Sequence, residues 1–433
     1  MAKVAFNTLG CKVNQYETES MMAQFEGKGY ETVAFTEKAD VYIINTCTVT
    51  NMADKKSRQM LSKAKKKNPE ALVVAVGCYV QASQSSLDEV EHVDLLVGNT
   101  DKGHIVEVVE KYLDDKILPE VTDLTRYGTY DDMWLSHESG HVRVHIKVQD
   151  GCDQFCSYCI IPFARGRIRS RESASVIEEV TSLTAKGYEE IVLTGIHLAS
   201  YGVQFEQYRL IDLLEELDQL DGLKRIRLGS LEPTLITEEF VQRLSQLSKV
   251  CDHFHLSMQS GDDEILAAMN RNYTTEHYWH AVELLRDTYP DCGITTDLIV
   301  GFPGESDQHF KHTLGFIKKV AFSDVHVFKY SKRDGTKAAA MTNQVDGRIK
   351  SHRSKEALAL VEDLRADFLD RYKSSVCKVL VEEDVVIDGS SYYVGHTTNF
   401  LKVYLEAKTG LGPKGIVQCT VEKRFRDGLL ARL

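Results

Sequence analysis

Three cysteines lie close together in the middle of the chain, in the stretch GCDQFCSYCIIPFARGR at residues 151–167. They are Cys152, Cys156 and Cys159, and Tyr158 directly precedes the last of them. Clustered thiols in a reducing compartment indicate metal binding or catalysis before disulfides. Structural zinc closes with four ligands, typically as paired C-x2-C units, and no second pair is present here. The spacing instead favours an iron–sulfur cluster held by three thiolates, with one iron free to bind a substrate.

Three further cysteines are dispersed through the first hundred residues. Cys11, Cys47 and Cys78 each lie at, or just beyond, the carboxyl end of a predicted strand. Ligands bind at that edge of open parallel sheets, so we expect the three thiols to meet in one crevice. A single cysteine at a strand end is more often a packing residue, since free cysteine is among the most buried residue types. Three at equivalent positions favour a shared metal site.

The elements that position these cysteines are predicted from the hydrophobic pattern. In residues 1–125, short apolar runs alternate with segments of helical spacing, which predicts an open α/β domain with a parallel sheet. The predicted strands are residues 3–10, 40–47, 71–78 and 93–99, and the predicted helices are residues 16–29 and 51–68. Residues 113–140 lack sustained periodicity and are expected to form a linker.

A second alternation of strands and helices follows, in a domain expected at residues 138–370. The predicted strands are residues 141–148, 190–196, 224–230, 253–259, 293–301 and 324–330. Helical segments separate them, for example residues 173–187 and 262–289. Six β/α units predict a (β/α)6 partial TIM barrel, open on one side. The cysteine loop directly follows the first of these strands, which places it on the face where such barrels do their chemistry.

The end of the chain has a different pattern. A helix is expected from about residue 349 to residue 372, and residues 371–433 then show short alternating strands with Gly punctuation. This pattern predicts a small antiparallel β-barrel as a third domain. The overall fold class is therefore α/β with an all-β C-terminal domain.

Composition restricts the class of protein. The 433 residues are 43% hydrophobic and 27% charged, which is typical of a soluble globular protein. Because no signal-peptide-like or membrane-spanning apolar run is evident, we expect a cytoplasmic location and no membrane partner. The net charge of −12 argues against indiscriminate nucleic-acid binding, but it leaves room for a local basic face. The lysine-rich run at residues 55–67 is either such a face or a solvated helix surface.

The cysteine loop resembles the signature of the radical S-adenosylmethionine (SAM) enzymes, which use an open six-unit barrel. The resemblance implies that the free iron of a [4Fe–4S] cluster chelates the methionine part of SAM. One electron from the cluster then cleaves the sulfonium, and the resulting 5′-deoxyadenosyl radical abstracts hydrogen from a C–H bond. In such enzymes the cofactor performs the hard step, and the protein positions and shields it.

Further matches resemble the methylthiotransferases within this superfamily. These are the N-terminal segment TLGCKVNQYE, the dispersed cysteines and a small C-terminal β domain of the TRAM kind. The resemblance implies that Cys152, Cys156 and Cys159 hold the SAM-binding cluster. It also implies that Cys11, Cys47 and Cys78 hold an auxiliary cluster that carries the sulfur to be inserted. The remaining cysteines match no ligand position and are interpreted as packing residues; they are Cys251, Cys292, Cys377 and Cys419.

The resemblance also suggests SAM contacts. Thr194 and Gly195, in LTGI, occupy the place where the family approaches the SAM amino group, although the family's Gly-Gly-Glu form is absent. Candidates for the carboxylate or ribose lie at or after later strand ends, where polar groups must be hydrogen-bonded in any case; they are Ser230, Glu232, Gln259 and Arg271. The segment DLIVGFPGE, with Gly301, Pro303 and Gly304, resembles the stretch along the adenine, or is a simple turn. Tyr158 is a further cofactor-binding candidate.

The resemblance is strongest to members that convert N6-threonylcarbamoyladenosine, beside the tRNA anticodon, into its 2-methylthio derivative. The matching segments are TLGCKVNQYE, CIIPFARGRIRSR, LGSLEP and HLSMQSG. The target adenosine would be flipped out of the anticodon loop, where unstacking a base costs little free energy. Arg165 and Arg167 could then bind RNA phosphate or the threonyl carboxylate. An electron donor such as flavodoxin or ferredoxin would be a protein partner.

The C-terminal domain is predicted to bind RNA, or its aromatic residues form its own hydrophobic core. The residues considered are Tyr392, Tyr393, Phe400, Lys402, Lys423, Arg424 and Arg426. Two alternatives keep the chemistry and change the substrate to isopentenyladenosine in tRNA or to an aspartate of a ribosomal protein. An anionic threonylcarbamoyl group needs an Arg or Lys in its pocket, whereas an isopentenyl group needs an apolar wall. A third alternative is a zinc-stabilised RNA-binding protein without catalysis.

Overall fold

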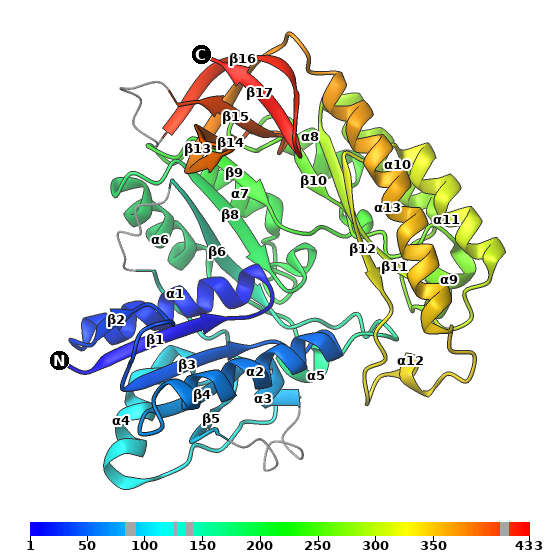
Figure 1. Ribbon diagram of the computed structural model, residues 1–433. Coiled ribbons are helices and arrows are strands. Elements are labelled where there is room, and N and C mark those ends of the chain that lie inside the picture. Colours follow the sequence, from blue (N-terminus) through cyan, green and yellow to red (C-terminus); the bar gives the residue numbers. More distant parts are fainter. Residues whose placement is uncertain (83–91, 125–127, 136–141, 408–414) are drawn as a thin grey trace.

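Three sheet-containing regions follow one another along the chain (Figure 1). The computed structural model describes residues 1–82, 92–124, 128–135, 142–407 and 415–433. Parts of the expected linker, at residues 125–127 and 136–140, therefore lie outside the described residues. Within the described ranges, no helix combines the length and the apolar composition that a membrane crossing requires.

The first region contains a five-stranded parallel sheet with the strand order β2-β1-β3-β4-β5. All residues of β3 and β4 are buried, because helices cover both faces of a parallel sheet and its central strands are consequently apolar throughout. The edge strand β2 was not expected from the sequence, since a strand of three residues is too short to show a pattern. The strands are β1 (Lys3–Thr8), β2 (Glu31–Val33), β3 (Val41–Thr46), β4 (Leu72–Gly77) and β5 (Leu95–Val97).

The helices of this region begin close to the strand ends. Helix α1 starts directly after Cys11, four positions before the expected start at residue 16, and α2 matches its prediction within one residue. Helix α1 contacts both the first sheet and the strands β6 and β8 of the central region, so it lies between the two sheets (Figure 1). The helices are α1 (Lys12–Gly27), α2 (Asn51–Lys67), α3 (Cys78–Ala82) and α4 (Ile105–Asp115), with a 3-10 turn at Lys102–His104.

The central region contains all six expected strands, arranged in two sheets. Strands β6, β8 and β9 are parallel, and β10, β11 and β12 form a second parallel sheet. Isolated parallel bridges between Ile226 and Val250 and between Leu231 and Leu256 link the two sheets. The short antiparallel strand β7 beside β6 was not expected. The strands are β6 (Arg143–Asp150), β7 (Arg169–Ser170), β8 (Glu190–Gly195), β9 (Arg225–Leu228), β10 (His253–His255), β11 (Gly293–Val300) and β12 (Asp324–Lys329).

Helices separate these strands, and one prediction about them is wrong. Residues 262–289 were expected to form one helical stretch, but the structure has two helices, α9 and α10. Asn270 adopts a left-handed backbone conformation with φ +59°, which ends the first helix, and the Thr274 side chain caps the second. The helices are α5 (Ile161–Arg165), α6 (Ser173–Ala185), α7 (Leu210–Asp218), α8 (Glu238–Leu244), α9 (Asp263–Ala268), α10 (Thr275–Thr288), α11 (Asp307–Val320), α12 (Lys337–Ala340) and α13 (Gly347–Asp370).

The third region is a closed five-stranded barrel in the order β13-β14-β15-β17-β16. Four of its pairings are antiparallel, and the pairing of β15 with β17 is parallel. The expectation of a wholly antiparallel barrel is therefore wrong in one place. An odd number of strands cannot close with every neighbour antiparallel, so one parallel pair is required. The strands are β13 (Val376–Ile387), β14 (Ser390–His396), β15 (Lys402–Glu406), β16 (Gly415–Phe425) and β17 (Gly428–Arg432).

This barrel is attached to the central region through buried arginines. Arg225 donates hydrogen bonds to the carbonyls of Lys378 and His396, and Arg227 donates to those of Thr397 and Thr398. The attachment therefore uses the β9 residues near the amino-terminal end of the central strands. It leaves the carboxyl ends of the strands, where the cysteine loop lies, to face the first region.

Candidate active site

The cysteine loop follows β6 and turns back on itself. The Cys159 amide donates to the Cys156 carbonyl at 2.9 Å, and the Cys152 amide donates to the Gly166 carbonyl at 3.0 Å. Cys156 is buried, and Cys152 and Cys159 are half-buried. The three sulfurs are close enough to interact electrostatically. We call Cys152, Cys156 and Cys159 the loop trio.

The break between α9 and α10 holds the loop trio in place. The Ser157 amide donates to the Met269 carbonyl at 2.9 Å, and the Asn270 side-chain amide donates to the carbonyls of Gln154 and Phe155. Arg271 donates from Nη1 to the Cys156 sulfur at 3.1 Å and from Nη2 to the Glu232 carboxylate. The helix break thus aims a cation at one thiol of the trio.

The other three cysteines also come together. Cys11, Cys47 and Cys78 directly follow or nearly follow β1, β3 and β4, which are neighbours in the sheet. Gly10, with φ +102°, lies so close to Cys47 that an added Cβ would be 2.8 Å from the Cys47 Cβ. Cys47 and Cys78 are buried and Cys11 is exposed. The three sulfurs interact electrostatically with one another, as the expected crevice requires, and we call them the dispersed trio.

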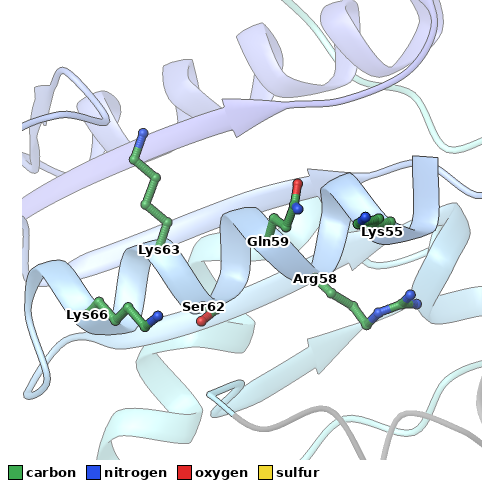
Figure 2. Close-up of a pocket in the computed structure, with 6 residues that line it drawn as sticks. All are labelled: Lys55, Arg58, Gln59, Ser62, Lys63 and Lys66. Atoms are coloured by element: carbon green, nitrogen blue, oxygen red, sulfur yellow. The ribbon is translucent and has the colours of Figure 1, made fainter. Parts of the chain in front are cut away.

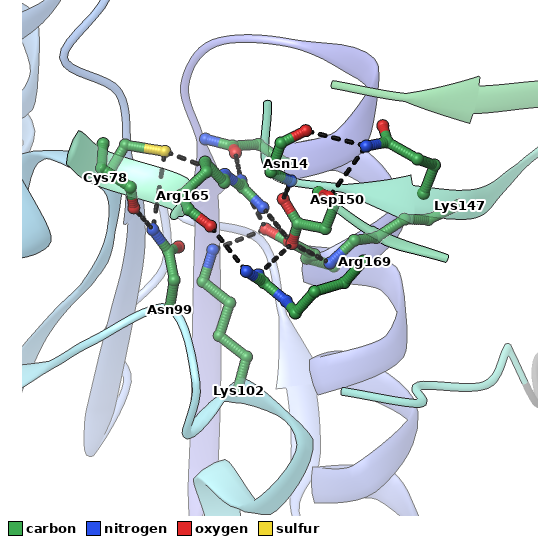
Figure 3. A network of polar contacts seen from close by, with 12 residues as sticks. Asn14, Cys78, Asn99, Lys102, Lys147, Asp150, Arg165 and Arg169 are labelled. Atoms are coloured by element: carbon green, nitrogen blue, oxygen red, sulfur yellow. Dashed lines mark hydrogen bonds and ion pairs between the residues drawn. The ribbon is translucent and has the colours of Figure 1, made fainter. Parts of the chain in front are cut away.

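One arginine of the central region contacts the dispersed trio. Arg165, at the end of α5, donates from Nε to the Cys78 sulfur at 3.2 Å (Figure 3). Its side chain is fully buried and also binds the carboxylates of Glu17 in α1 and Asp150 in β6, and the side-chain oxygen of Asn14. Arg165 lies six residues beyond Cys159, so the short helix α5 connects the loop trio to the dispersed trio.

Arg165 belongs to a buried network of charges between the first and central regions. Lys102 pairs with Glu17 at 2.5 Å, and Lys147 pairs with Glu17 at 2.9 Å and with Asp150 at 2.7 Å. Burial alone would raise the pKa of Glu17, but Arg165, Lys102 and Lys147 outweigh it and hold that pKa well below its usual range. Buried charges of this kind are tolerated because each has partners of opposite sign. The network fixes the position of α1 relative to β6.

The donor set of both trios suits an iron–sulfur cluster. Hydrogen bonds to cysteine sulfur, of the kind that Arg165 and Arg271 donate, occur at such clusters and tune their potentials. Burial raises the pKa of Cys47 and of Cys152 to about 11 and that of Cys159 to about 12, so these thiols are protonated until a metal displaces the protons.

The candidate SAM contacts lie at or after strand ends of the central region. Thr194 is buried at the end of β8 with its hydroxyl bonded to the Val192 carbonyl, and Gly195 lies so close to Gln149 that a Cβ would be 2.8 Å from its Oε1. Gln259 has φ +63° and pairs through its backbone with β11. Glu232 and Arg271 form an ion pair next to Cys156. The structure brings these groups to the same end of the strands as the cysteine loop.

Other candidates have clear structural roles. Tyr158 packs against the Phe302 ring, with 6.4 Å between ring centroids. Gly301 has φ +72°, and an added Cβ would be 2.3 Å from the Lys350 side chain, so this glycine is required by a turn packed against α13. Gly304 likewise faces Asn343. Ser230 is exposed after β9.

Two predictions about RNA contacts are wrong. Arg165 cannot meet RNA phosphate or the threonyl carboxylate, because its guanidinium is buried and fully used by the network. Phe400 stacks between His253 and His396 at the junction with the central region, so it is an interface residue rather than an RNA platform. Arg167 is exposed and pairs with Asp153 at 3.3 Å.

The remaining C-terminal candidates are partly engaged with their surroundings. Tyr392 packs against Tyr404 and Phe425, and Tyr393 packs against the barrel core. The pairs formed by the cations are Lys402 with Asp427, Arg424 with Asp370 and Arg426 with Asp388. Lys423 is exposed.

The lysine-rich run forms an exposed basic helix face. Helix α2 buries Ser57, Leu61 and Ala64 against the sheet, and its outer face forms a shallow open depression (Figure 2). The lining residues are Lys55, Arg58, Gln59, Ser62, Lys63 and Lys66. The helix begins at Asn51, four residues beyond Cys47, so this basic face leads toward the dispersed trio.

Sequence reasoning missed the residues that support the trios. Glu17, Lys102 and Lys147 were not identified, although Glu17 lies within the quoted segment TLGCKVNQYE. A usable signal was the placement of charged residues inside apolar strand and helix patterns, where an unpaired charge would be costly. The partners themselves are 85 and 130 positions away from Glu17, so only the fold identifies them.

Comparisons with known proteins agree with this geometry. Residues 146–317 match the model of the radical SAM superfamily, and residues 3–98 match that of the uncharacterised protein family UPF0004. The fold is similar to that of the radical SAM methyltransferase TsrM from Kitasatospora setae, solved with cobalamin and a [4Fe–4S] cluster. The TM-score is 0.58 at 17% identity, over 78% of this chain and 77% of the other. The class is thus that of a radical SAM protein.

Curated relatives narrow the class. The chain is 40% identical to the threonylcarbamoyladenosine tRNA methylthiotransferase MtaB of Bacillus subtilis, over 93% of this chain and 90% of the relative. It is 35% identical to the tRNA-2-methylthio-N(6)-dimethylallyladenosine synthase of Alkaliphilus oremlandii, over 88% of this chain and 82% of the relative. This chain belongs to the radical SAM methylthiotransferase family. It is an enzyme whose cofactors are SAM and [4Fe–4S] clusters.

Proposed function

We propose that this enzyme converts N6-threonylcarbamoyladenosine, next to the anticodon of tRNA, into its 2-methylthio derivative. The observation that carries the proposal is the contact between Arg165 and Cys78, because it joins the two thiol trios through the short helix α5. Inserting sulfur at a C–H bond needs a radical source and a sulfur source close to one substrate. The choice of modified adenosine rests on the relatives of Bacillus subtilis and Aquifex aeolicus, each 40% identical to this chain.

The loop trio is the proposed holder of the SAM-binding cluster, and the dispersed trio is the proposed holder of an auxiliary cluster. When bound, the clusters supply the electron for SAM cleavage and the site that carries the sulfur. Each trio offers three thiols and leaves one coordination position for a reactant. The spacing of the thiols supports clusters over single zinc ions. In the described part of the chain, the ligand group whose atoms all lie within 4.8 Å of one another is His255, Asp297 and His326, and it contains no cysteine.

The protein's own groups orient and shield the reactants. Arg271 donates to Cys156 and is held by Glu232, which orients this thiol of the loop trio. Thr194, Gly195, Gln259 and Glu232 are the proposed neighbours of SAM, because they line the strand ends beside the loop. The Arg165 network seals the junction behind the dispersed trio against water.

The proposed domains are residues 1–125, 138–370 and 371–433. The two central sheets are proposed to be the halves of one open six-unit barrel, and the C-terminal barrel is proposed to be a TRAM-like RNA-binding domain. For tRNA, we propose contacts with the basic face of α2 and with the exposed cations of the C-terminal barrel. The electron donor and a cytoplasmic location remain predictions.

Analysis of tRNA nucleosides tests the substrate. In a strain lacking this protein, mass spectrometry should find N6-threonylcarbamoyladenosine without its 2-methylthio derivative, and the gene for this protein should restore that derivative. A 2-methylthio-isopentenyladenosine that disappears instead would support the isopentenyl alternative. Purified protein offers a second check, since anaerobic preparations should be brown and contain iron, whereas a colourless zinc protein would contradict the enzyme.

A further inference from the structure

Lys12 is a cation between the first region and the strands of the central region, and it has no partner in the described part of the chain. It follows Cys11 directly and is the first residue of α1. Its side chain is exposed, and among the described residues no carboxylate oxygen lies within 4.0 Å of its ammonium nitrogen. The Lys12 ammonium group is therefore free to bind an anionic ligand.

The charged groups around Lys12 come from the inner face of the barrel. Arg143 of β6, Glu190 of β8 and Arg227 of β9 all act on it electrostatically. Lys12 in turn acts on His145 of β6, so its ammonium group lies on the side of the central strands. This direction agrees with the contacts of α1 with β6 and β8.

The same ammonium group acts on the far side of the barrel. The charge of Lys12 acts electrostatically on His253 of β10 and on His326 of β12. His326 pairs with Asp297 at 3.3 Å, and His255 pairs with the same carboxylate at 3.5 Å. The charge of Lys12 therefore acts on groups from β6, β8, β9, β10 and β12.

The acids of this interior already have basic partners. Glu190 accepts from Arg227 Nε at 2.8 Å, and Arg143 pairs with Glu382 at 2.7 Å. Asp297 lies between its two histidines. Lys12 is thus a positive charge left over after these pairs form, and an anionic ligand would be attracted to it.

The start of α1 adds to this attraction. The helix has sixteen residues, no acidic residue in its first turn and no side-chain hydrogen bond at its N-cap, Cys11. Its first backbone N–H groups have no intrahelical acceptor, and the helix dipole makes this end electropositive. The side chain and the helix terminus therefore favour an anion at the same place.

We propose that Lys12 binds the carboxylate of the threonylcarbamoyl group and so selects an anionic substituent on the adenosine over a neutral one. The inference rests on the proposed function and names the residue that recognises its substrate. In the adenine ring, C2 accepts the sulfur and C6 carries the N6 substituent, and both atoms neighbour N1. The cation that binds the substituent must therefore lie near the sulfur-carrying site. Lys12 meets this requirement because it neighbours Cys11, whereas Arg165 is buried and fully bonded.

The test compares two anticodon stem–loops in the holoenzyme. One carries N6-threonylcarbamoyladenosine, and the other carries its carboxamide analogue, which has the same shape without the charge. Equilibrium Kd and kcat/KM for methylthiolation are measured for the wild type, Lys12→Met, Lys12→Arg and the control Lys28→Met. Lys28 is a matched control because it is an exposed lysine at the opposite end of α1.

Lys12→Met should weaken binding of the natural stem–loop about 10- to 100-fold, as expected when a charge-assisted hydrogen bond is removed. It should change the carboxamide stem–loop less than about threefold, and Lys12→Arg should restore most of the discrimination. Iron content and SAM cleavage should match those of the wild type.

Three outcomes would overturn the inference. If Lys12→Met weakened binding of both stem–loops equally, Lys12 would support the neighbouring cysteine and would not recognise the carboxylate charge. An unchanged Kd for the natural stem–loop would show that Lys12 does not touch the substrate. A wild type that modifies only an isopentenyladenosine stem–loop would overturn the proposed function itself, together with this residue's role.

Discussion

The two cysteine trios are built on the same plan in different settings. In each, an arginine from another segment donates to one sulfur, Arg271 to Cys156 and Arg165 to Cys78. Each arginine is held in turn by a glutamate, Glu232 or Glu17. The loop trio draws all these groups from the central region, whereas the dispersed trio takes its arginine from across the junction.

The difference shows how the two sites depend on the fold. The loop trio occupies eight consecutive positions and needs mainly a local turn and the break after α9. The dispersed trio needs three neighbouring strands, and its Arg165 is integrated in buried charges from both regions. We therefore expect the loop trio to tolerate changes at the junction that the dispersed trio does not.

The largest expected effect is the loss of a loop-trio ligand. Cys156→Ala should abolish SAM cleavage and, with it, methylthiolation, because no electron can reach SAM without its cluster. The measurement is 5′-deoxyadenosine production under reducing, anaerobic conditions. Cys251→Ala serves as the control, because this buried cysteine lies outside both trios. Persistent SAM cleavage by Cys156→Ala would show that the loop trio does not hold the SAM-binding cluster.

A change in the dispersed trio should separate SAM cleavage from methylthiolation. Cys47→Ala should retain SAM cleavage within about threefold while methylthiolated product falls below detection, because the sulfur-carrying site is lost. Both products are measured in the same reaction. If the variant still modified tRNA, the dispersed trio would not be the source of sulfur, and the comparison between the trios would fail.

The arginines should differ in their contribution to stability. Arg165→Met takes from Glu17 and Asp150 one of their two shared partners and leaves Lys147 as the other. Breaking a buried ion pair in this way costs up to about 3–5 kcal/mol. Arg271→Met removes one partner of Glu232 within a single region and should cost about 1–3 kcal/mol. Urea unfolding of the metal-free proteins gives both values. Equal costs would show that the junction network stabilises no more than the local pair.

The smallest effect concerns the basic face of α2, which leads to the dispersed trio. Reversing Lys63 and Lys66 to Glu should weaken tRNA binding about tenfold at low salt and lower the salt slope by about 2, because each lysine is expected to neutralise one phosphate. Filter binding across salt concentrations measures both quantities. The matched control reverses Lys311 and Lys318 on the outer helix α11, and equal weakening there would indicate a general charge effect.

The sequence predicted the strands well and the connections less well. All six central strands lie where the alternation of apolar runs places them, because buried parallel strands carry a strong local signal. The helix break at Asn270 was missed, since residues 262–289 have helical spacing throughout and a single left-handed residue leaves that pattern intact. Short edge strands such as β2 and β7 were missed because two or three residues show no period.

Two metal sites were indicated by the amino-acid order, through three closely spaced thiols and three thiols at strand ends, and the resemblance to the radical SAM enzymes implied the type of chemistry. That the dispersed cysteines would meet followed as well, since the carboxyl ends of parallel strands share one edge of a sheet. Which charges support the thiols depended on the folded chain. Arg165 looked like an RNA-binding residue by composition, yet folding buries it against Cys78 and Glu17, because a charge taken from water must find partners that lie far away in the sequence.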